Sequence, residues 1–282
     1  MNTALFCGLT TIDVVNVVDE VPTTNQKIVS HETRIDVGGP AANAARTAAA
    51  LGVPARLVTL LGNSAFARLA LEQLFSEGIE VIDLAADDNF PVSTVLLDAQ
   101  GKRTVISRNN PEREFVLPDS SVLDDVAILE IDGHFVEVQE QYANYCKKRN
   151  IPVVFDGGSW KRGTGRLLPL IDHAIISADF EVPNISATTL QYLSQYKYQL
   201  LAQTHGDEPI QALTGEQVTT LPIPRVRVSD TLGAGDVLHG AYTALLPQAT
   251  NPLTALRQAS IMATKSTQFP GVLTWIENER DF

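Results

Sequence analysis

Cysteine is scarce in this chain, and long apolar runs are missing. Cys7 and Cys146 are the two cysteines among 282 residues; they are too few for a disulfide framework and have no metal-site spacing. No apolar stretch approaches the roughly 20 residues that span a bilayer, and the first residues lack the basic segment and cleavage site of a signal peptide. We therefore expect a chain of the reducing cytoplasm, with no disulfide and no membrane partner.

Basic residues are also few in comparison with acidic ones. The 21 Lys and Arg residues against 33 Asp and Glu residues give a formal net charge of −12, which argues against a nucleic-acid partner bound through a broad basic surface. A small anionic ligand stays compatible with this balance, because a few main-chain N–H groups at the start of a helix can bind a phosphate. The apolar share of 44% is ordinary for a globular chain with a sizeable core.

Two common nucleotide-binding motifs are absent. No Gly-x-x-x-x-Gly-Lys-Ser/Thr occurs, so the chain has no P-loop. No Gly-x-Gly-x-x-Gly follows the first apolar run, so the dinucleotide-binding Rossmann pattern is missing too. The five histidines are scattered, with no metal-binding spacing. We expect His239 to lie one helical turn after Asp236, as a packing residue or a contact behind the site rather than a catalytic group.

Apolar runs alternate with helical stretches, which predicts an α/β fold with a mostly parallel central sheet. We expect strands over 4–9, 56–61, 78–84, 126–131, 153–156, 174–177 and 199–203, and helices over 41–51, 65–76, 137–149, 233–246 and 253–267. Two segments, 13–35 and 91–108, break the rhythm and predict a small β insertion, the second of them a hairpin. Such projecting elements often cover a site. No linker divides residues 1–282 into separate domains.

The most informative motif is Asp230-Thr231-Leu232-Gly233-Ala234-Gly235-Asp236, which opens a helical stretch. Its glycines let the main chain turn sharply and approach a ligand closely. The helix start directs unpaired N–H groups and the positive end of the helix dipole at this loop, which predicts an anion hole. Asp236, in the first turn, is placed to accept a proton from an attacking hydroxyl. A plain glycine turn is the alternative, but the complete seven-residue pattern favours a site.

On this motif, the chain resembles the ribokinase-like (PfkB) family of carbohydrate and nucleoside kinases. Asp-Thr-x-Gly-Ala-Gly-Asp is highly specific for that family, and residues 8–13 and 38–43 look like two of its other segments. The resemblance covers essentially the whole chain. It implies a three-layer ribokinase-like α/β fold with a small β-strand lid. The implied reaction transfers the γ-phosphoryl group of ATP to a hydroxyl of a small sugar, with Mg²⁺.

The resemblance also implies roles for individual residues. Asp236 would be the general base, and the main chain around Asp230 would hold a monovalent cation such as K⁺. Short Asp and Asn side chains suit sugar hydroxyls, because they lose little entropy on ordering. The implied anion hole is formed by the amides of Gly233, Ala234 and Gly235, the sugar site by Asp13, Gly38, Gly39 and Asn43, and the ATP site by Thr204, Gly206, Thr231, Gly233 and Gly235.

Two segments depart from the family pattern. Where the family often carries Asn-x-x-Glu to organise Mg²⁺ through water, this chain has Ser177-Ala178-Asp179-Phe180-Glu181. Asp179 either takes over part of that role or caps a following helix. In the segment 204–209, Pro209 replaces the second glycine of a Thr-x-Gly-x-x-Gly pattern. Because proline fixes φ and removes an N–H, we expect a remodelled nucleotide loop there.

Within the family, the chain looks most like the ketohexokinase and sulfofructose-kinase-like branch, on the stretches 101–104 and 156–162. Lys27 and Arg103 of the expected lid are candidates to reach the substrate, with ordinary solvated charges as the alternative. His134 follows a strand expected to end near the sugar, where an arginine would suit a sulfonate better. A neutral ketose or related sugar is therefore favoured over a sulfosugar.

Two other functions stay open. A nucleoside kinase would need aromatic or apolar faces to stack the base, which sequence cannot place. A catalytically silent sugar-sensing relative is suggested by the departures at Asp179 and Pro209 and opposed by the intact motif at 230–236. The half-apolar lid strands would leave an exposed face or edge, so we also expect a homodimer formed through the lid.

Overall fold

The computed structural model describes residues 3–87, 89–100, 103–108, 115–116 and 120–277. The strands of its central sheet are β1 (Thr3–Cys7), β4 (Ala55–Thr59), β5 (Glu80–Asp83), β8 (Val126–Ile131), β9 (Val153–Gly157), β10 (His173–Ser177), β11 (Leu200–His205), β12 (Glu208–Thr214) and β13 (Gln217–Leu221). They lie in the order β13-β12-β11-β10-β9-β8-β1-β4-β5. In this order, all neighbouring strands between β11 and β5 pair in parallel, and β12 and β13 add an antiparallel edge.

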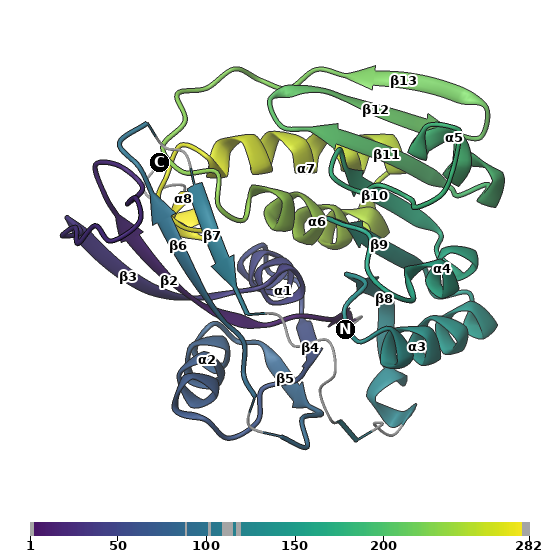
Figure 1. Ribbon diagram of the computed structural model, residues 1–282. Helices are drawn as coiled ribbons and strands as arrows, with labels where there is room; N and C mark the ends of the chain where they lie inside the picture. Colours follow the sequence, from purple (N-terminus) through teal and green to yellow (C-terminus); the bar gives the residue numbers. More distant parts are fainter. Residues whose placement is uncertain (1–2, 88, 101–102, 109–114, 117–119, 278–282) are drawn as a thin grey trace.

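Helices cover both faces of this sheet (Figure 1). They are α1 (Pro40–Ala50), α2 (Ala65–Ser76), α3 (Val136–Arg149), α4 (Thr164–Leu167), α5 (Thr189–Leu193), α6 (Ala234–Leu245), α7 (Pro252–Ser266) and α8 (Thr274–Glu277), with short 3-10 turns at Ser120–Leu123, Leu168–Leu170, Ser194–Tyr196 and Leu246–Gln248. One core joins the sheet to α1, α2, α6, α7 and α8, and a second joins it to α3, α4 and α5. The predicted three-layer α/β fold is confirmed. Within the described residues, no helix combines the length and apolar character needed to cross a bilayer.

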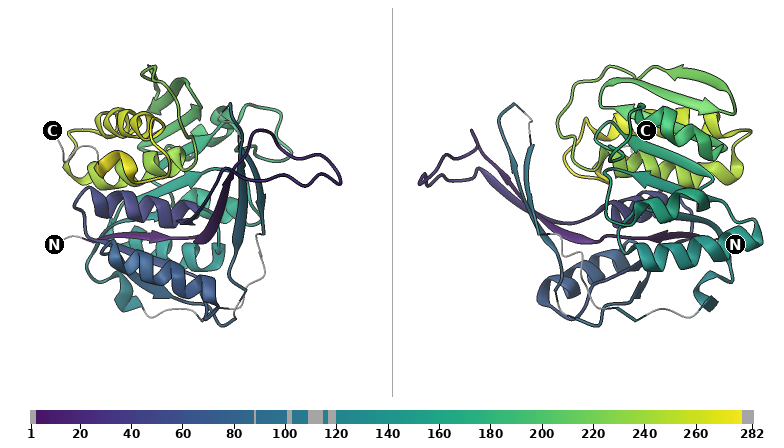
Figure 2. Two further views of the ribbon diagram at one scale, coloured as in Figure 1. Left: turned by 90° about the vertical axis from the view of Figure 1, so that its left-hand side faces the viewer. Right: turned by 45° about the vertical axis from the view of Figure 1, so that its right-hand side comes forward.

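A second sheet stands apart from the layers (Figure 2). It consists of β2 (Thr11–Val17), β3 (Glu32–Gly38), β6 (Val92–Leu97) and β7 (Arg103–Ser107), in the order β3-β2-β6-β7. These strands lie in the two segments expected to form the insertion, and we call this sheet the lid. The predicted hairpin is β6 and β7, which pair antiparallel; residues 101–102 of its turn lie outside the described part. The chain enters the lid directly from β1 and leaves it directly into α1, so the base of the lid adjoins both.

Local sequence accounts for most helix ends. Pro40 is at the first position of α1, and Gly52 adopts a φ of +84° just after that helix ends. The Ser64 side chain accepts a hydrogen bond from the Ala67 N–H at the start of α2. The strands β12 and β13 were not anticipated. They are largely polar and lie at the sheet edge, so the apolar pattern that reveals a buried strand is absent there.

Candidate active site

The sharpest turn of the predicted site lies at the start of α6. Gly233 precedes the helix with a φ of +75°, and a β-carbon there would lie 2.7 Å from the Val272 side chain. The Ala234 N–H donates to the Thr231 carbonyl at 3.3 Å, which closes the turn. A β-carbon on Gly235 would meet no atom within 4 Å. The helix N-terminus therefore faces open space at Gly235, where a helix dipole and unpaired N–H groups favour an anion.

Two helices far apart in sequence meet at Asp236. The Asn43 side-chain amide, on α1, donates to the Asp236 Oδ2 at 2.8 Å. On its other side, the Asn43 Oδ1 accepts from the Arg46 guanidinium at 3.3 Å. A guanidinium can only donate, so Arg46 fixes the amide with its NH₂ group toward Asp236. The predicted sugar-binding residue and the predicted base are therefore in direct contact.

The carboxyl group of Asp236 has an unusual proton affinity. Burial is the main cause that raises its pKa, and the Asp156 and Asp13 carboxylates add to this. The hydrogen bond from Asn43 and the nearby His239 act in the opposite direction, and the resulting pKa is about 7. Such a value near neutrality suits a group that must both accept and release a proton.

The lid base brings Asp13 to the same place. Asp13 lies in β2 opposite Asp36 in β3, and its Oδ1 accepts from the Thr11 hydroxyl at 2.8 Å. A β-carbon on Gly38 would lie 2.1 Å from the Asp13 Oδ2, so only glycine admits this carboxylate. Gly39 follows at the start of α1 with a φ of +94°. Burial, with Asp36 nearby, raises the pKa of Asp13.

Asp230 is buried, and both of its carboxylate oxygens accept hydrogen bonds. Its Oδ1 accepts from the Leu232 N–H at 2.9 Å. Its Oδ2 accepts from the Gly271 N–H at 3.2 Å and from the Arg34 guanidinium of β3 at 3.4 Å. A cation of the chain itself thus neutralises this carboxylate. The monovalent cation expected at the main chain around Asp230 stays a prediction.

The two cations predicted to reach the substrate differ in position. The Arg103 guanidinium, on β7, donates to the Thr231 carbonyl at 3.2 Å, so it meets the turn before α6. Lys27 is exposed in the loop between β2 and β3. This loop projects away from the central sheet (Figure 2). The structure does not bring Lys27 to the site; its alternative interpretation as a solvated charge fits better.

Thr204, Gly206 and Asp179, predicted for the nucleotide and Mg²⁺, lie at or just after the carboxyl ends of two neighbouring strands. The main-chain carbonyl of Thr204, in β11, accepts from the Ala178 N–H at 2.9 Å just after β10. Gly206, with a φ of +69°, lies in the tight turn that joins β11 to β12. A two-residue hairpin turn thus joins the strands, and Pro209 lies in β12; the remodelled nucleotide loop stays a prediction. Asp179 is exposed, and its N–H donates to the Ser177 hydroxyl at 3.0 Å.

Arg34 and Arg46 were missed as parts of the site, since their partners lie far away in the sequence. Arg46 offered one signal. It is charged within an alanine-rich stretch and lies three residues after Asn43, which places both on one helix face. Its guanidinium also pairs with Glu77 at 2.7 Å and Asp36 at 3.0 Å.

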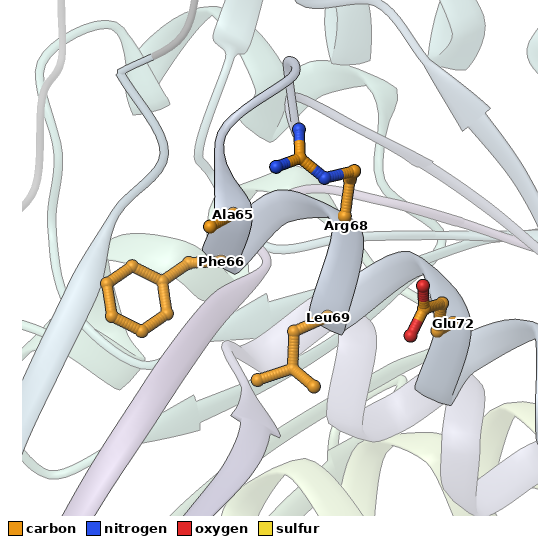
Figure 3. A pocket seen from close by; sticks show the side chains of 5 residues that line it. All are labelled: Ala65, Phe66, Arg68, Leu69 and Glu72. Carbon is orange, nitrogen blue, oxygen red and sulfur yellow. The ribbon is translucent and has the colours of Figure 1, made fainter.

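A surface hollow lies away from this site. Figure 3 shows a hollow on the outer side of α2, lined by Ala65, Phe66, Arg68, Leu69 and Glu72. It contains none of the residues above and no group of opposed polar side chains that converge. Among the described residues, no three His, Cys, Asp or Glu side chains come together as a metal site. The chemistry of the molecule is therefore concentrated where the lid, α1 and α6 meet.

Comparison with known proteins identifies the family of the chain. A family profile described as "pfkB family carbohydrate kinase" matches residues 1–278. The chain belongs to this family. It is therefore an ATP-dependent carbohydrate kinase, a phosphotransferase with an alcohol group as acceptor.

Individual relatives are distant. The kinase is 24% identical to a ribokinase of Arabidopsis thaliana over 94% of this chain and 76% of that protein. A ribokinase structure from Thermotoga maritima superposes with a TM-score of 0.76 at 20% identity, covering 100% of this chain and 99% of the other. An Arabidopsis thaliana ribokinase complexed with ribose and ATP gives a TM-score of 0.75 at 19% identity over 98% of each chain. These structures support the ribokinase-like fold, and the ketohexokinase-like branch stays a prediction.

Proposed function

We propose that this kinase phosphorylates a hydroxyl of a small neutral carbohydrate, a ketose or related sugar, with Asp236 as the general base. The observation that carries the proposal is the contact between Asn43 and Asp236 beside the glycine turn of α6. A hydroxyl next to this carboxylate would also lie beside a helix N-terminus that favours an anion. That combination suits phosphoryl transfer, which depends on positioning and on charge stabilisation.

The proposed step balances as follows. The sugar hydroxyl gives its proton to the Asp236 carboxylate while its oxygen bonds to the γ-phosphorus of ATP. The bond between that phosphorus and the β,γ-bridging oxygen breaks, and ADP leaves. The Gly233 and Gly235 amides stabilise the transferring group, because the Ala234 N–H is already used by Thr231. Asp13, Asn43 and the main chain at Gly38 and Gly39 hold the other sugar hydroxyls.

The site suits ATP and Mg²⁺ better than it suits K⁺. Thr204, Gly206 and Thr231 are proposed to line the nucleotide. Mg²⁺ suits a site with few carboxylates, since it keeps several waters and binds substrate phosphates; Asp179 would contact it through water. When bound, Mg²⁺ neutralises phosphate charge. K⁺ at the main chain around Asp230 fits less well, because the Arg34 guanidinium already places a positive charge beside that carboxylate.

The test is ADP release with ATP and Mg²⁺ across ketoses, aldoses, sugar acids, ribose and nucleosides. Turnover with one neutral sugar supports the proposal, and turnover with nucleosides alone favours the nucleoside-kinase alternative. Thermal stabilisation by a sugar without any ADP formed would favour the silent sugar-sensing alternative.

Asp236→Asn tests the base directly. The amide cannot take the proton at neutral pH, so we expect turnover to fall about 10²–10⁴-fold, the usual scale for a general base. Sugar binding, followed by thermal shift, should persist because Asn43 and Asp13 remain. Near-normal turnover of this variant would disprove the assignment.

A further inference from the structure

The His239 ring is held between α6 and the central sheet by two main-chain carbonyls. Its Nδ1 lies 2.7 Å from the Gly235 carbonyl oxygen, and its Nε2 lies 3.0 Å from the Ile175 carbonyl oxygen in β10. Carbonyl oxygens only accept hydrogen bonds, so both ring nitrogens have to donate. A neutral imidazole carries a single N–H, and only the imidazolium satisfies both contacts.

The surroundings of the ring suit a positive charge. The Asp156 Oδ2, at the end of β9, lies 3.4 Å from Nδ1, and both side chains are less than a tenth exposed. The other charged or titratable groups that act on the ring are Glu130 of β8 and Asp236 of α6 itself. Burial lowers the pKa of His239, but Asp156, Glu130 and the two carbonyls outweigh it, and the pKa is raised. Glu130 accepts from the Thr243 hydroxyl, and burial raises its pKa to about 8. Burial also raises the pKa of Asp156, but Asp156 lies 3.4 Å from the ring and contributes more than Glu130 to the raised pKa of His239, so it is the main counter-charge.

We propose that His239 is a permanently protonated positioning residue of the phosphoryl-transfer site. As an imidazolium it fixes the first turn of α6 against β9 and β10. The Gly235 carbonyl and the Asp236 N–H belong to one planar peptide and point in opposite directions. Holding that carbonyl toward the sheet therefore aims the Asp236 N–H out of the helix end, toward the anion, and places a positive charge behind the base.

This role rests on the proposed function of Asp236, but the protonation state can be tested without any activity. We would record nitrogen-15 spectra of histidine-labelled protein in which the exposed His31 and the half-buried His205 are replaced by glutamine. Burial lowers the pKa of His134 and His173 to about 4, so these two are neutral at about pH 8. One remaining ring with two protonated nitrogens is expected. If every ring carries a single proton at that pH, the proposal fails.

The kinetic test compares two buried histidines. His239→Gln keeps one donor but loses the charge, so we expect kcat to fall about tenfold or more, with little change in the sugar KM. The acid limb of the pH profile should move to higher pH, because Asp236 loses a positive neighbour. His173→Gln is the control. The His173 Nδ1, in β10, lies 2.9 Å from the Tyr242 hydroxyl of α6, and no carboxylate among the described residues is paired with this ring. That variant should not shift the limb.

The outcomes distinguish the role of His239 from the role of Asp236. If His239→Gln folds and leaves both kcat and the acid limb unchanged, His239 has no positioning role. If it does not fold, the nitrogen spectrum of the native protein still decides whether the ring is an imidazolium. If Asp236→Asn keeps its turnover, the base assignment fails, while the spectrum of His239 is unaffected by that result.

Discussion

At the scale of single residues, the pKa of Asp236 results from opposing effects of its neighbours. Burial and Asp156 raise its pKa, whereas Asn43 and His239 lower it, and the balance is about 7. Only the ionised form can accept a proton. We therefore expect kcat/KM to increase with pH up to about 7 and to level off above, with a roughly tenfold change per pH unit on the acid side. Steady-state kinetics at fixed ionic strength measure this limb, and a flat profile between about pH 5 and 8 would contradict it.

The two glycines around Ala234 provide a matched pair. A β-carbon on Gly235 meets only open space, while one on Gly233 lies 2.7 Å from Val272 in a backbone with a φ of +75°. We expect Gly235→Ala to keep its melting temperature, yet to lose about tenfold or more in turnover because the methyl group enters the space of the anion. Gly233→Ala should instead lose stability, by about 1 kcal/mol or more. Thermal unfolding and ADP release distinguish the two, and a fully active Gly235→Ala would refute the placement of the phosphoryl group.

At the scale of elements, the site depends on how closely α1 and α6 approach. A β-carbon on Gly240 would lie 2.3 Å from the Ala44 carbonyl, so only glycine permits this distance. The close approach sets Asn43 against Asp236. The alanines of α1 also permit the close approach, because their small side chains occupy little space between the two helices.

The lid is joined to the loop before α6 by two arginines with different partners. Arg34 neutralises the buried Asp230, whereas Arg103 meets the Thr231 carbonyl. We expect the native kinase to work equally in K⁺ and Na⁺. Arg34→Gln leaves Asp230 without a cation, so its turnover should increase with K⁺ by roughly three- to tenfold, the effect of about 1 kcal/mol.

Arg103→Gln is the control for that experiment, since it removes no partner of a carboxylate and should show no K⁺ dependence. Kinetics in K⁺, Na⁺ and choline buffers compare the three proteins. Strong K⁺ stimulation of the native kinase would mean that Asp230 binds the ion despite Arg34.

At the scale of the whole molecule, the active site reduces the stability of the fold. The pKa of Asp236 is raised from 3.8 to about 7 on folding. Below about pH 4 both the folded and unfolded chains hold the proton. As pH rises toward about 7, the unfolded chain releases its proton first, so the free energy of unfolding decreases; above about 7 the loss is complete.

Asp236→Asn removes this loss. We expect the variant to melt about 2–4 °C higher than the native protein at about pH 8, the shift that ~1 kcal/mol produces in a domain of this size. The difference should shrink toward about pH 5. Thermal scans across pH measure it, and a variant that is destabilised at every pH would show that the carboxylate is not held at an energetic cost.

The predicted homodimer also concerns the whole molecule. Ile35 and Ile106 are 53% and 65% exposed, and the strand registers place them in one row with Val14 and Thr94 across the lid. This apolar row is compatible with a second lid. The homodimer stays a prediction.

The sequence by itself determined most of the secondary structure and the position of the chemistry. Glycine, proline and cap residues act on their immediate neighbours, so α1, α2 and the turn at Gly233 could be located from local patterns. The motif at 230–236 indicated the family, because its seven residues are contiguous in the sequence. The strands β12 and β13 were missed because only Ile210, Ala212 and Leu221 of them are buried, so they lack the continuous apolar run of a strand covered on both faces.

Tertiary structure alone decided which distant groups meet. Asn43 of α1 meets Asp236 of α6, Arg34 of β3 meets the buried Asp230, and Lys27 lies in the loop between β2 and β3 rather than in the site. The first two contacts form only after the lid and the helices have packed. Because hydrogen bonds and ion pairs act over a few ångströms while their partners lie tens to hundreds of residues apart, no local pattern encodes them.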